Sequence, residues 1–270
     1  MSALRLVEKG YSVLVIEKGS RLGPEDFPKS NWNLKRWMWA PALGFRGLFS
    51  MTFFRHVTIF HGVGVGGGSL VYANTLPIPN ATFFTAPSWG HLADWGEELA
   101  PHYKTARRML GAEVVPFTTP TDEALAAVGR AIGKEAEPTT VSVYFGEEGE
   151  TVEDPYFDGE GPDRTGCVRC GGCMLGCPNN AKNTLDKNYL YLAEKRGVQV
   201  LPDTQVHAIA PTDSGFRIEA KGSRWFGDRQ TFTADRVVLA GGVLGTVPLL
   251  LKLKESTLPR LSERVGDFVR

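Results

Sequence analysis

The stretch Ala3-Leu-Arg-Leu-Val-Glu-Lys-Gly10-Tyr-Ser-Val-Leu-Val-Ile-Glu17 indicates the fold class of this chain. Its apolar residues follow a helical period up to Gly10, and residues 12–16 are apolar enough for a buried strand. A helix that leads into such a strand and then an acid is the second half of a dinucleotide-binding βαβ unit. Glu17 stands where that acid holds the ribose, although a surface glutamate at a strand end would look the same. The first strand and its G-x-G-x-x-G turn do not precede it, so we expect a truncated chain.

A second informative stretch is rich in glycine. Gly62-Val-Gly-Val-Gly-Gly-Gly-Ser69 formally contains G-x-G-x-x-G and follows a strand-like run at residues 57–60. Pro77 and Pro79 exclude the long helix that a pyrophosphate loop must open. Five glycines in seven residues instead predict backbone pressed against something large and flat, because only glycine lacks a Cβ that would collide. A plain flexible turn is the alternative.

All four cysteines lie in one run, and the candidate metal ligands are Cys167, Cys170, Cys173 and Cys177. Their spacing, followed by Pro178, is that of a bacterial iron–sulfur loop. In two-cluster ferredoxins, however, the fourth cysteine serves the other cluster, and this chain has no second run. Zinc favours two separated pairs of ligands, and four cysteines in 270 residues are too sparse for a disulfide framework. A bound iron–sulfur cluster and a packed, metal-free loop both remain open.

The composition is that of a neutral globular protein, with 30 basic and 30 acidic side chains and 42% hydrophobic residues. No basic run offers a footprint for nucleic acid, so nucleic acid is excluded as a partner. The longest charge-free apolar stretches, near residues 37–45 and 237–251, are shorter than the ~20 residues of a membrane helix. We therefore expect no transmembrane segment. A cytoplasmic location is a separate expectation.

The remaining segments predict an α/β fold that includes a small antiparallel meander. Expected helices cover residues 99–110, 123–134, 184–196 and 246–254. Expected short strands cover residues 198–201, 205–209, 216–219 and 231–233, and residues 236–245 predict a buried strand that runs into a glycine turn.

Taken together, these stretches resemble the glucose–methanol–choline (GMC) flavoprotein oxidoreductases, most closely the cholesterol oxidase-like branch. Glu17 and residues 62–74, 237–245 and 258–266 carry the resemblance, which covers nearly the whole chain. It implies an FAD-binding Rossmann-like domain of the glutathione-reductase type with an inserted α+β substrate lobe, present here as a fragment. Residues 1–75 and 183–270 would form the FAD-binding domain, and residues 76–182 the inserted lobe, with the Cys loop at 167–178.

The same resemblance implies where FAD would lie. Glu17 would bind the adenosine ribose, Val206 would offer backbone to the adenine, and Ala240 and Gly241 would close over the nucleotide. The diphosphate and the isoalloxazine would lie along Gly62, Gly64, Gly66, Gly67, Gly68, Ser69 and Leu70. Asn74 lies two residues beyond the place where steroid-oxidising relatives have an asparagine, which puts the contact at the flavin edge in doubt.

The chemistry implied by the resemblance is hydride transfer from an apolar or sterol-like alcohol to flavin, with oxygen or a redox partner as electron acceptor. The family's catalytic histidine lies well beyond Arg270, so no catalytic residue is named. We expect these 270 residues alone to bind FAD poorly and to be inactive. The alternative function is an iron–sulfur electron-transfer module in which the Cys loop is the functional centre.

Overall fold

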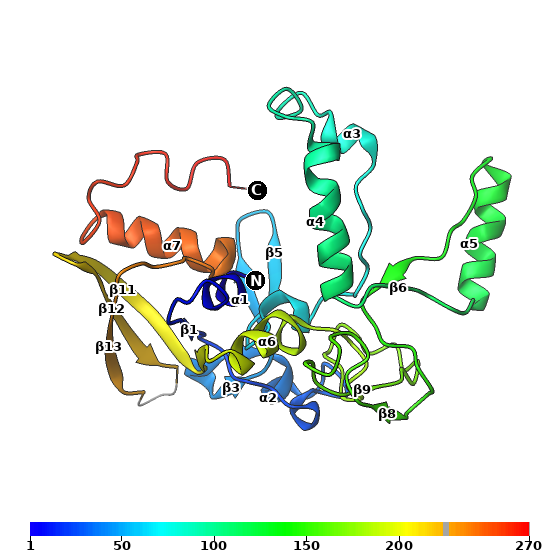
Figure 1. Ribbon diagram of the computed structural model, residues 1–270, viewed down its shortest axis with the longest axis horizontal. Coiled ribbons are helices and arrows are strands. Elements are labelled where there is room, and N and C mark those ends of the chain that lie inside the picture. Colours follow the sequence, from blue (N-terminus) through cyan, green and yellow to red (C-terminus); the bar gives the residue numbers. More distant parts are fainter. Residues whose placement is uncertain (224–226, 270) are drawn as a thin grey trace.

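The computed structural model describes residues 1–223 and 227–269, so Arg270, the last residue of the predicted third segment, lies outside the described residues. A central body of small sheets carries a meander and α7 on one side and the projecting helices α4 and α5 on the other (Figure 1). Within these two ranges, no helix has the length and apolar character needed to cross a membrane. The predicted division into three segments stays a prediction.

The helices are α1 Ser2–Val7, α2 Leu34–Trp37, α3 Ala81–Phe84, α4 Trp95–Met109, α5 Pro120–Ala131, α6 Tyr189–Lys195 and α7 Gly242–Lys254, with short 3-10 helices η1 Pro24–Asp26, η2 Pro41–Leu43, η3 Gly67–Leu70 and η4 Leu185–Lys187. The strands are β1 Leu14–Ile16, β2 Trp39–Ala40, β3 Phe45–Arg46, β4 Phe49–Phe53, β5 Thr58–Gly62, β6 Glu113–Val114, β7 Thr140–Val141, β8 Thr151–Val152, β9 Arg164–Thr165, β10 Gln199–Leu201, β11 Thr204–Thr212, β12 Gly215–Gly222 and β13 Arg229–Ala234.

The helix and strand predicted at the N-terminus are present as α1 and β1. Strand β1 pairs in parallel with β10, with Leu14 opposite Gln199. Helices α1 and α6 pack together through the buried side chains of Leu4, Leu192 and Ala193. Among the described residues, this parallel sheet has two strands, which leaves the larger Rossmann-like sheet a prediction.

The predicted meander is confirmed, and each of its three strands is longer than the strand predicted from the sequence. Strands β11, β12 and β13 form an antiparallel sheet, and α7 covers it (Figure 1). Ile209, Ile218 and Leu253 are the buried centre of this unit. The register of β11 shifts between Val206 and Ala208, a bulge that turns the strand locally.

The sequence predicts a buried strand that runs into a glycine turn at residues 236–245, and the strand is wrong: residues 236–241 form none. This segment adopts no regular structure, and the side chains of Val238 and Leu239 are 57% and 40% exposed. An apolar run becomes a strand only where a neighbouring strand supplies hydrogen-bond partners. The β1–β10 pair does not extend to this segment. Helix α7 also begins earlier than predicted, at Gly242.

The helix predicted at residues 184–196 is interrupted at Asn188. The backbone of Asn188 has φ −131° and ψ −94°, which is outside the helical region. Its side chain accepts a hydrogen bond of 2.6 Å from the amide of Tyr189 and caps α6. A 3-10 turn, η4, therefore precedes a shorter helix, which ends before Gly197 as predicted.

The two helices predicted in the middle of the chain begin earlier than their apolar patterns suggested. Asp94 caps α4 by accepting a hydrogen bond of 3.1 Å from the amide of Glu97. Thr119 and Asp122 form a capping box at the start of α5, with Pro120 in the first turn. The polar capping residues, rather than the first apolar residue, set where each helix starts.

Candidate functional site

The glycine loop joins β5 to η3 and is anchored from two sides. The amide of Val63 donates to the Leu48 carbonyl at 2.9 Å, and the amide of Val65 donates to the Ser20 carbonyl at 3.0 Å. Both valine side chains are buried. The loop thus lies against the turn that follows β1, although the two segments are more than forty residues apart.

Three of the loop glycines are required by the protein itself. Gly64 and Gly66 have φ of +140° and +115°, a region that other residues rarely adopt. A Cβ at Gly66 would lie 2.7 Å from the Asp186 carboxylate, and a Cβ at Gly62 would lie 2.7 Å from the Gly67 carbonyl oxygen. Packing and backbone geometry therefore account for these glycines without any ligand.

Gly67 and Gly68 are different, because a Cβ at either position would meet no protein atom within 4 Å. Gly67 has φ of +57°, which favours glycine. Gly68 shows no positive φ, so neither packing nor backbone conformation of the described chain requires glycine there. The loop thus presents bare backbone to open space at these two positions. Its close approach to a flat group stays a prediction.

The residues that end the loop have structural partners. The Ser69 hydroxyl donates to the Gly66 carbonyl at 2.7 Å and accepts from the amide of Leu185 at 2.9 Å. The Leu70 side chain is buried in a core with Phe27 and Leu48. Because both side chains already have protein partners, Ser69 and Leu70 could line a ligand only with their backbone atoms.

Asn74 is buried and carries an unpaired acceptor. Its backbone has φ +66°, its carbonyl accepts from the amide of Ser142 at 3.0 Å, and its side chain is 4% exposed. The side-chain Oδ1 has no hydrogen-bond partner among the described residues. Its contact to a flavin edge stays a prediction.

Glu17 lies beside the glycine loop, as the nucleotide interpretation requires. Its carboxylate accepts a hydrogen bond of 2.8 Å from the amide of Gly19. A Cβ on Gly19 would lie 2.4 Å from the amide nitrogen of Gly64, so the turn and the loop are in backbone contact. Burial raises the pKa of Glu17 above its usual range, and hydrogen bonds from nearby backbone amides oppose that rise.

The variant Glu17→Gln is expected to remove a pH dependence of folding stability. Because burial raises the folded-state pKa of Glu17, the stabilisation from its protonation is complete below the unfolded value near 4.5 and is lost as pH rises through the folded pKa. Glutamine keeps an acceptor for the Gly19 amide but cannot ionise. Urea unfolding at about pH 5 and about pH 8 should show the glutamine variant gaining stability relative to wild type as pH rises. A pH-independent difference would contradict this.

The other predicted nucleotide contacts come from the second half of the chain. Val206, Ile16 and Val237 each pack against the buried core of Ile209, Ile218 and Leu253, so the end of β1 and the start of the meander border one cluster. Ala240 and Gly241 are exposed just before α7. Their closure over a nucleotide stays a prediction.

The Cys loop brings its four thiols around one small cavity, which Val143, Ala181 and Lys182 also line. All four cysteines are free, Cys177 buried and Cys170 exposed. Three sulfurs accept N–H hydrogen bonds: Cys167 from Arg169 at 3.4 Å, Cys170 from Asn179 at 3.7 Å and Cys177 from Lys182 at 3.4 Å. Across residues 1–223 and 227–269, however, no group of three or more His, Cys, Asp or Glu side chains is placed to hold a metal ion. The iron–sulfur interpretation therefore finds no support here.

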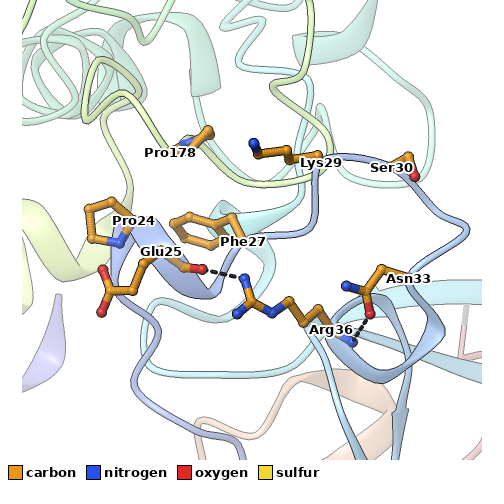
Figure 2. A pocket seen from close by; sticks show the side chains of 8 residues that line it. All are labelled: Pro24, Glu25, Phe27, Lys29, Ser30, Asn33, Arg36 and Pro178. Carbon is orange, nitrogen blue, oxygen red and sulfur yellow. Dashed lines mark hydrogen bonds between the residues drawn. The ribbon is translucent and has the colours of Figure 1, made fainter.

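Next to the Cys loop lies an open cavity of about 660 Å³ that the sequence did not predict (Figure 2). Within the lining of this cavity, the Arg36 guanidinium donates a hydrogen bond to the Glu25 carbonyl. Asn33, which also lines the cavity, caps α2. Pro178, directly after the last cysteine, forms part of its wall. The lining residues are Pro24, Glu25, Phe27, Lys29, Ser30, Asn33, Arg36 and Pro178.

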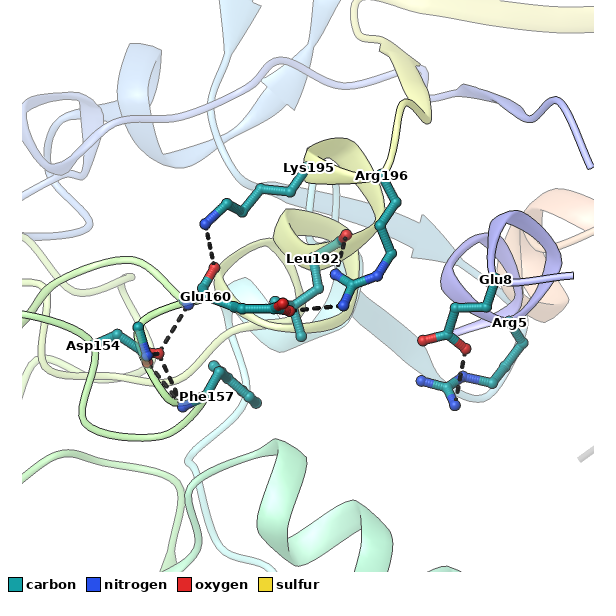
Figure 3. A network of polar contacts seen from close by, with 10 residues as sticks. Arg5, Glu8, Asp154, Phe157, Glu160, Leu192, Lys195 and Arg196 are labelled. Atoms are coloured by element: carbon teal, nitrogen blue, oxygen red, sulfur yellow. Dashed lines mark hydrogen bonds and ion pairs between the residues drawn. The ribbon is translucent and has the colours of Figure 1, made fainter. Parts of the chain in front are cut away.

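A polar network holds the loop at residues 154–161 against the end of α6 (Figure 3). The Asp154 carboxylate accepts backbone hydrogen bonds of 2.9–3.1 Å from residues 156, 157, 159 and 161. Glu160 then binds α6 through its carbonyl, 2.9 Å from Lys195 Nζ, and through its carboxylate, 2.7 Å from the Arg196 guanidinium. These contacts tie the region that contains the Cys loop to the helix that packs on α1.

Comparison of the sequence with known proteins identifies the family. Residues 160–266 match the family model described as GMC oxidoreductase. The chain thus carries a domain of the GMC oxidoreductase family, and the family recognised from the sequence is confirmed. The glycine loop lies outside the matched residues.

Full-length relatives extend the similarity to the whole chain. A protein named cholesterol oxidase from Acinetobacter baumannii is 46% identical over 285 residues, which cover 100% of this chain and 51% of the relative. Another with the same name, from Mycobacterium tuberculosis (strain H37Rv), is 47% identical over 281 residues, which cover 100% of this chain and 49% of the relative. The chain therefore spans about half the length of these relatives.

Proposed function

We propose that this chain is the FAD-binding part of an oxidoreductase that acts on the CH–OH group of an apolar, sterol-like alcohol. Membership of the GMC family and the similarity to proteins named cholesterol oxidase support this reaction class. Because the similarity runs through the whole chain, it includes the β1 turn and the glycine loop as well as the matched domain.

The single observation that carries the proposal is the bare backbone at Gly67 and Gly68, in the same loop whose Gly64 contacts the turn after Glu17. A Cβ at Gly68 would meet only open space, and its φ does not require glycine. Glycine at such a position is explained if a flat group approaches the backbone closely. The isoalloxazine of FAD is a flat group of this kind, and the residues present therefore fit the cofactor.

In this arrangement, Glu17 would accept hydrogen bonds from the ribose, and the backbone from Gly62 to Ser69 would line the diphosphate and the ring. When bound, FAD supplies the hydride acceptor for oxidation of the alcohol. The chain itself contributes binding and orientation: the buried valines of the glycine loop and the Ser20 carbonyl hold the loop in place. We propose oxygen as the electron acceptor, which is suggested by the name oxidase of the relatives.

The variant Gly68→Ala tests the FAD site directly. In the full gene product it should lower FAD affinity about 10-fold or more, because overpacking by one methyl group costs about 1–3 kcal/mol. The FAD-free protein should unfold within about 0.5 kcal/mol of wild type, since the added Cβ meets no protein atom. Flavin absorbance titration and urea unfolding measure the two quantities.

The matched control is Gly96→Ala in the first turn of α4, which projects away from the glycine loop (Figure 1). It adds the same methyl group with one contact of 3.4 Å, to Asp94. FAD affinity should be unchanged. Equal FAD affinity of the Gly68 variant and this control would remove the basis of the proposed site.

Oxygen consumption and hydrogen peroxide formation with cholesterol, measured on the full gene product carrying FAD, test the reaction itself. Oxidation of the 3-hydroxyl group is expected. A protein that holds FAD but oxidises no apolar alcohol would disprove the substrate class while leaving the cofactor assignment standing.

A further inference from the structure

Lys182 places a buried ammonium group against the segment that follows the glycine loop. Its side chain is fully buried. The ammonium Nζ donates hydrogen bonds to the carbonyl oxygens of Leu70 at 3.0 Å, Tyr72 at 2.8 Å and Cys173 at 2.8 Å. The centre of the Tyr72 ring lies 4.6 Å from the same atom. Three carbonyls thus take all three donors of the ammonium, and the aromatic face adds a cation–π contact.

This placement is energetically unfavourable for a lysine. Burial lowers the pKa of Lys182 to about 8, because removing an ammonium group from water disfavours its charged form. An apolar side chain of similar length would fill the same space without that cost. The presence of lysine is therefore best explained by what its three donors hold together.

Two of the three carbonyls belong to the segment that leaves the glycine loop. Leu70 ends η3, two residues after Gly68, and Tyr72 follows two residues later. The Tyr72 hydroxyl in turn donates to the Asn183 carbonyl at 2.9 Å, so the neighbour of Lys182 binds the same segment. Residues 70–72 are thereby fixed at both the backbone and the aromatic ring.

The third carbonyl belongs to the Cys loop. Besides the Nζ bond to Cys173, the backbone amide of Lys182 donates to the Cys177 sulfur at 3.4 Å. One residue thus joins the Cys loop to the segment after the glycine loop. The conformation of the thiol-bearing loop and the position of the glycine loop cannot change independently while these bonds persist.

We propose that Lys182 is a positioning residue for the flavin: its ammonium sets the backbone of residues 70–72, and with it the glycine loop, at the position that FAD binding requires. This inference rests on the proposed FAD function. It also gives the Cys loop a role that needs no metal, because the loop supplies one of the three carbonyls that hold the ammonium.

The test compares three variants of the full gene product. Lys182→Met keeps the length of the side chain and removes its charge and donors. Lys182→Arg keeps the charge and donors. Met109→Ala, at the end of α4, removes buried side-chain atoms from the separate core formed with Leu4 and Tyr189 and serves as a destabilised control. For each protein, the FAD release rate, the visible circular dichroism of bound flavin, kcat and KM are measured.

Lys182→Met is expected to release FAD at least 10-fold faster, to change the flavin dichroism and to lower kcat more than it changes KM. The flavin dichroism of Lys182→Arg should lie between that of Lys182→Met and that of wild type. The flavin dichroism of Met109→Ala should equal that of wild type. If Lys182→Met matches either wild type or Met109→Ala in both release rate and dichroism, the inference is overturned and only a structural role remains. A wild-type protein that binds no FAD would instead overturn the proposed function, and this inference with it.

Discussion

Gly19→Ala is expected to destabilise the folded protein by about 3 kcal/mol and to abolish FAD binding. The added Cβ would lie 2.4 Å from the Gly64 amide nitrogen and 2.7 Å from the Gly64 Cα. Both atoms are backbone, so a side-chain rotation cannot relieve the overlap. The glycine loop would have to move away from the β1 turn, which breaks the Val65-to-Ser20 hydrogen bond and displaces the loop from Glu17.

Gly23→Ala is the matched control for this variant, because it lies in the same segment and differs in what surrounds it. The three atoms nearest its Cβ would all belong to the carboxylate end of Glu25, the first at 2.8 Å, and that flexible side chain can move aside. We expect a cost below about 1 kcal/mol and normal FAD binding. Urea unfolding and flavin titration measure both effects. Equal unfolding free energies for the two variants would show that the turn and the loop are not in tight contact.

Arg164→Met should cost about 3–5 kcal/mol of folding stability, because it removes four hydrogen bonds made by a fully buried charge. The guanidinium donates to the Asn183 side chain at 2.7 Å and to the carbonyls of Pro162, Asp163 and Lys187 at 2.9–3.0 Å. Methionine fills much of the space but leaves these acceptors without their donor. The lobe around the Cys loop should loosen from η4 and from Asn183.

The control for the arginine variant is Arg217→Met in the meander. Arg217 is 54% exposed and pairs with Glu219 at 3.5 Å, and exposed pairs of this kind contribute about 0–1 kcal/mol. Thermal and urea unfolding of the two variants should therefore differ by several kcal/mol. A loss below about 1 kcal/mol for Arg164→Met would mean that water replaces the guanidinium at little cost.

The family and several elements could be predicted from the sequence because they depend on local signals. The period of residues 3–7 and the apolar run before Glu17 indicate α1 and β1 locally, and β10 supplies the hydrogen-bond partners of β1. The meander follows from alternating short strands and turn residues. The glycine loop is recognisable because glycine at so many nearby positions indicates backbone that must bend sharply or lie close to another group.

Other features depend on distant partners and could not be predicted. Residues 236–241 have the composition of a buried strand but lie exposed, because hydrogen-bond partners must come from elsewhere in the fold. Asn188 interrupts a strong helical pattern by capping α6 with its own side chain. The cysteine spacing indicated an iron–sulfur loop, and spacing cannot show whether the thiols are placed for a metal, since the surrounding loops decide that.

Local patterns in the sequence therefore indicate which family the chain belongs to and which segments are candidates for binding a nucleotide, since period, glycine density and the acid after β1 are local properties. The three-dimensional arrangement was needed to show which of the five loop glycines the protein needs for its own packing and which face open space. It also revealed that Lys182 lies behind the glycine loop and that Arg164 is buried against Asn183. Hydrogen bonding and close packing between residues distant in the chain depend on three-dimensional position, which no local pattern specifies.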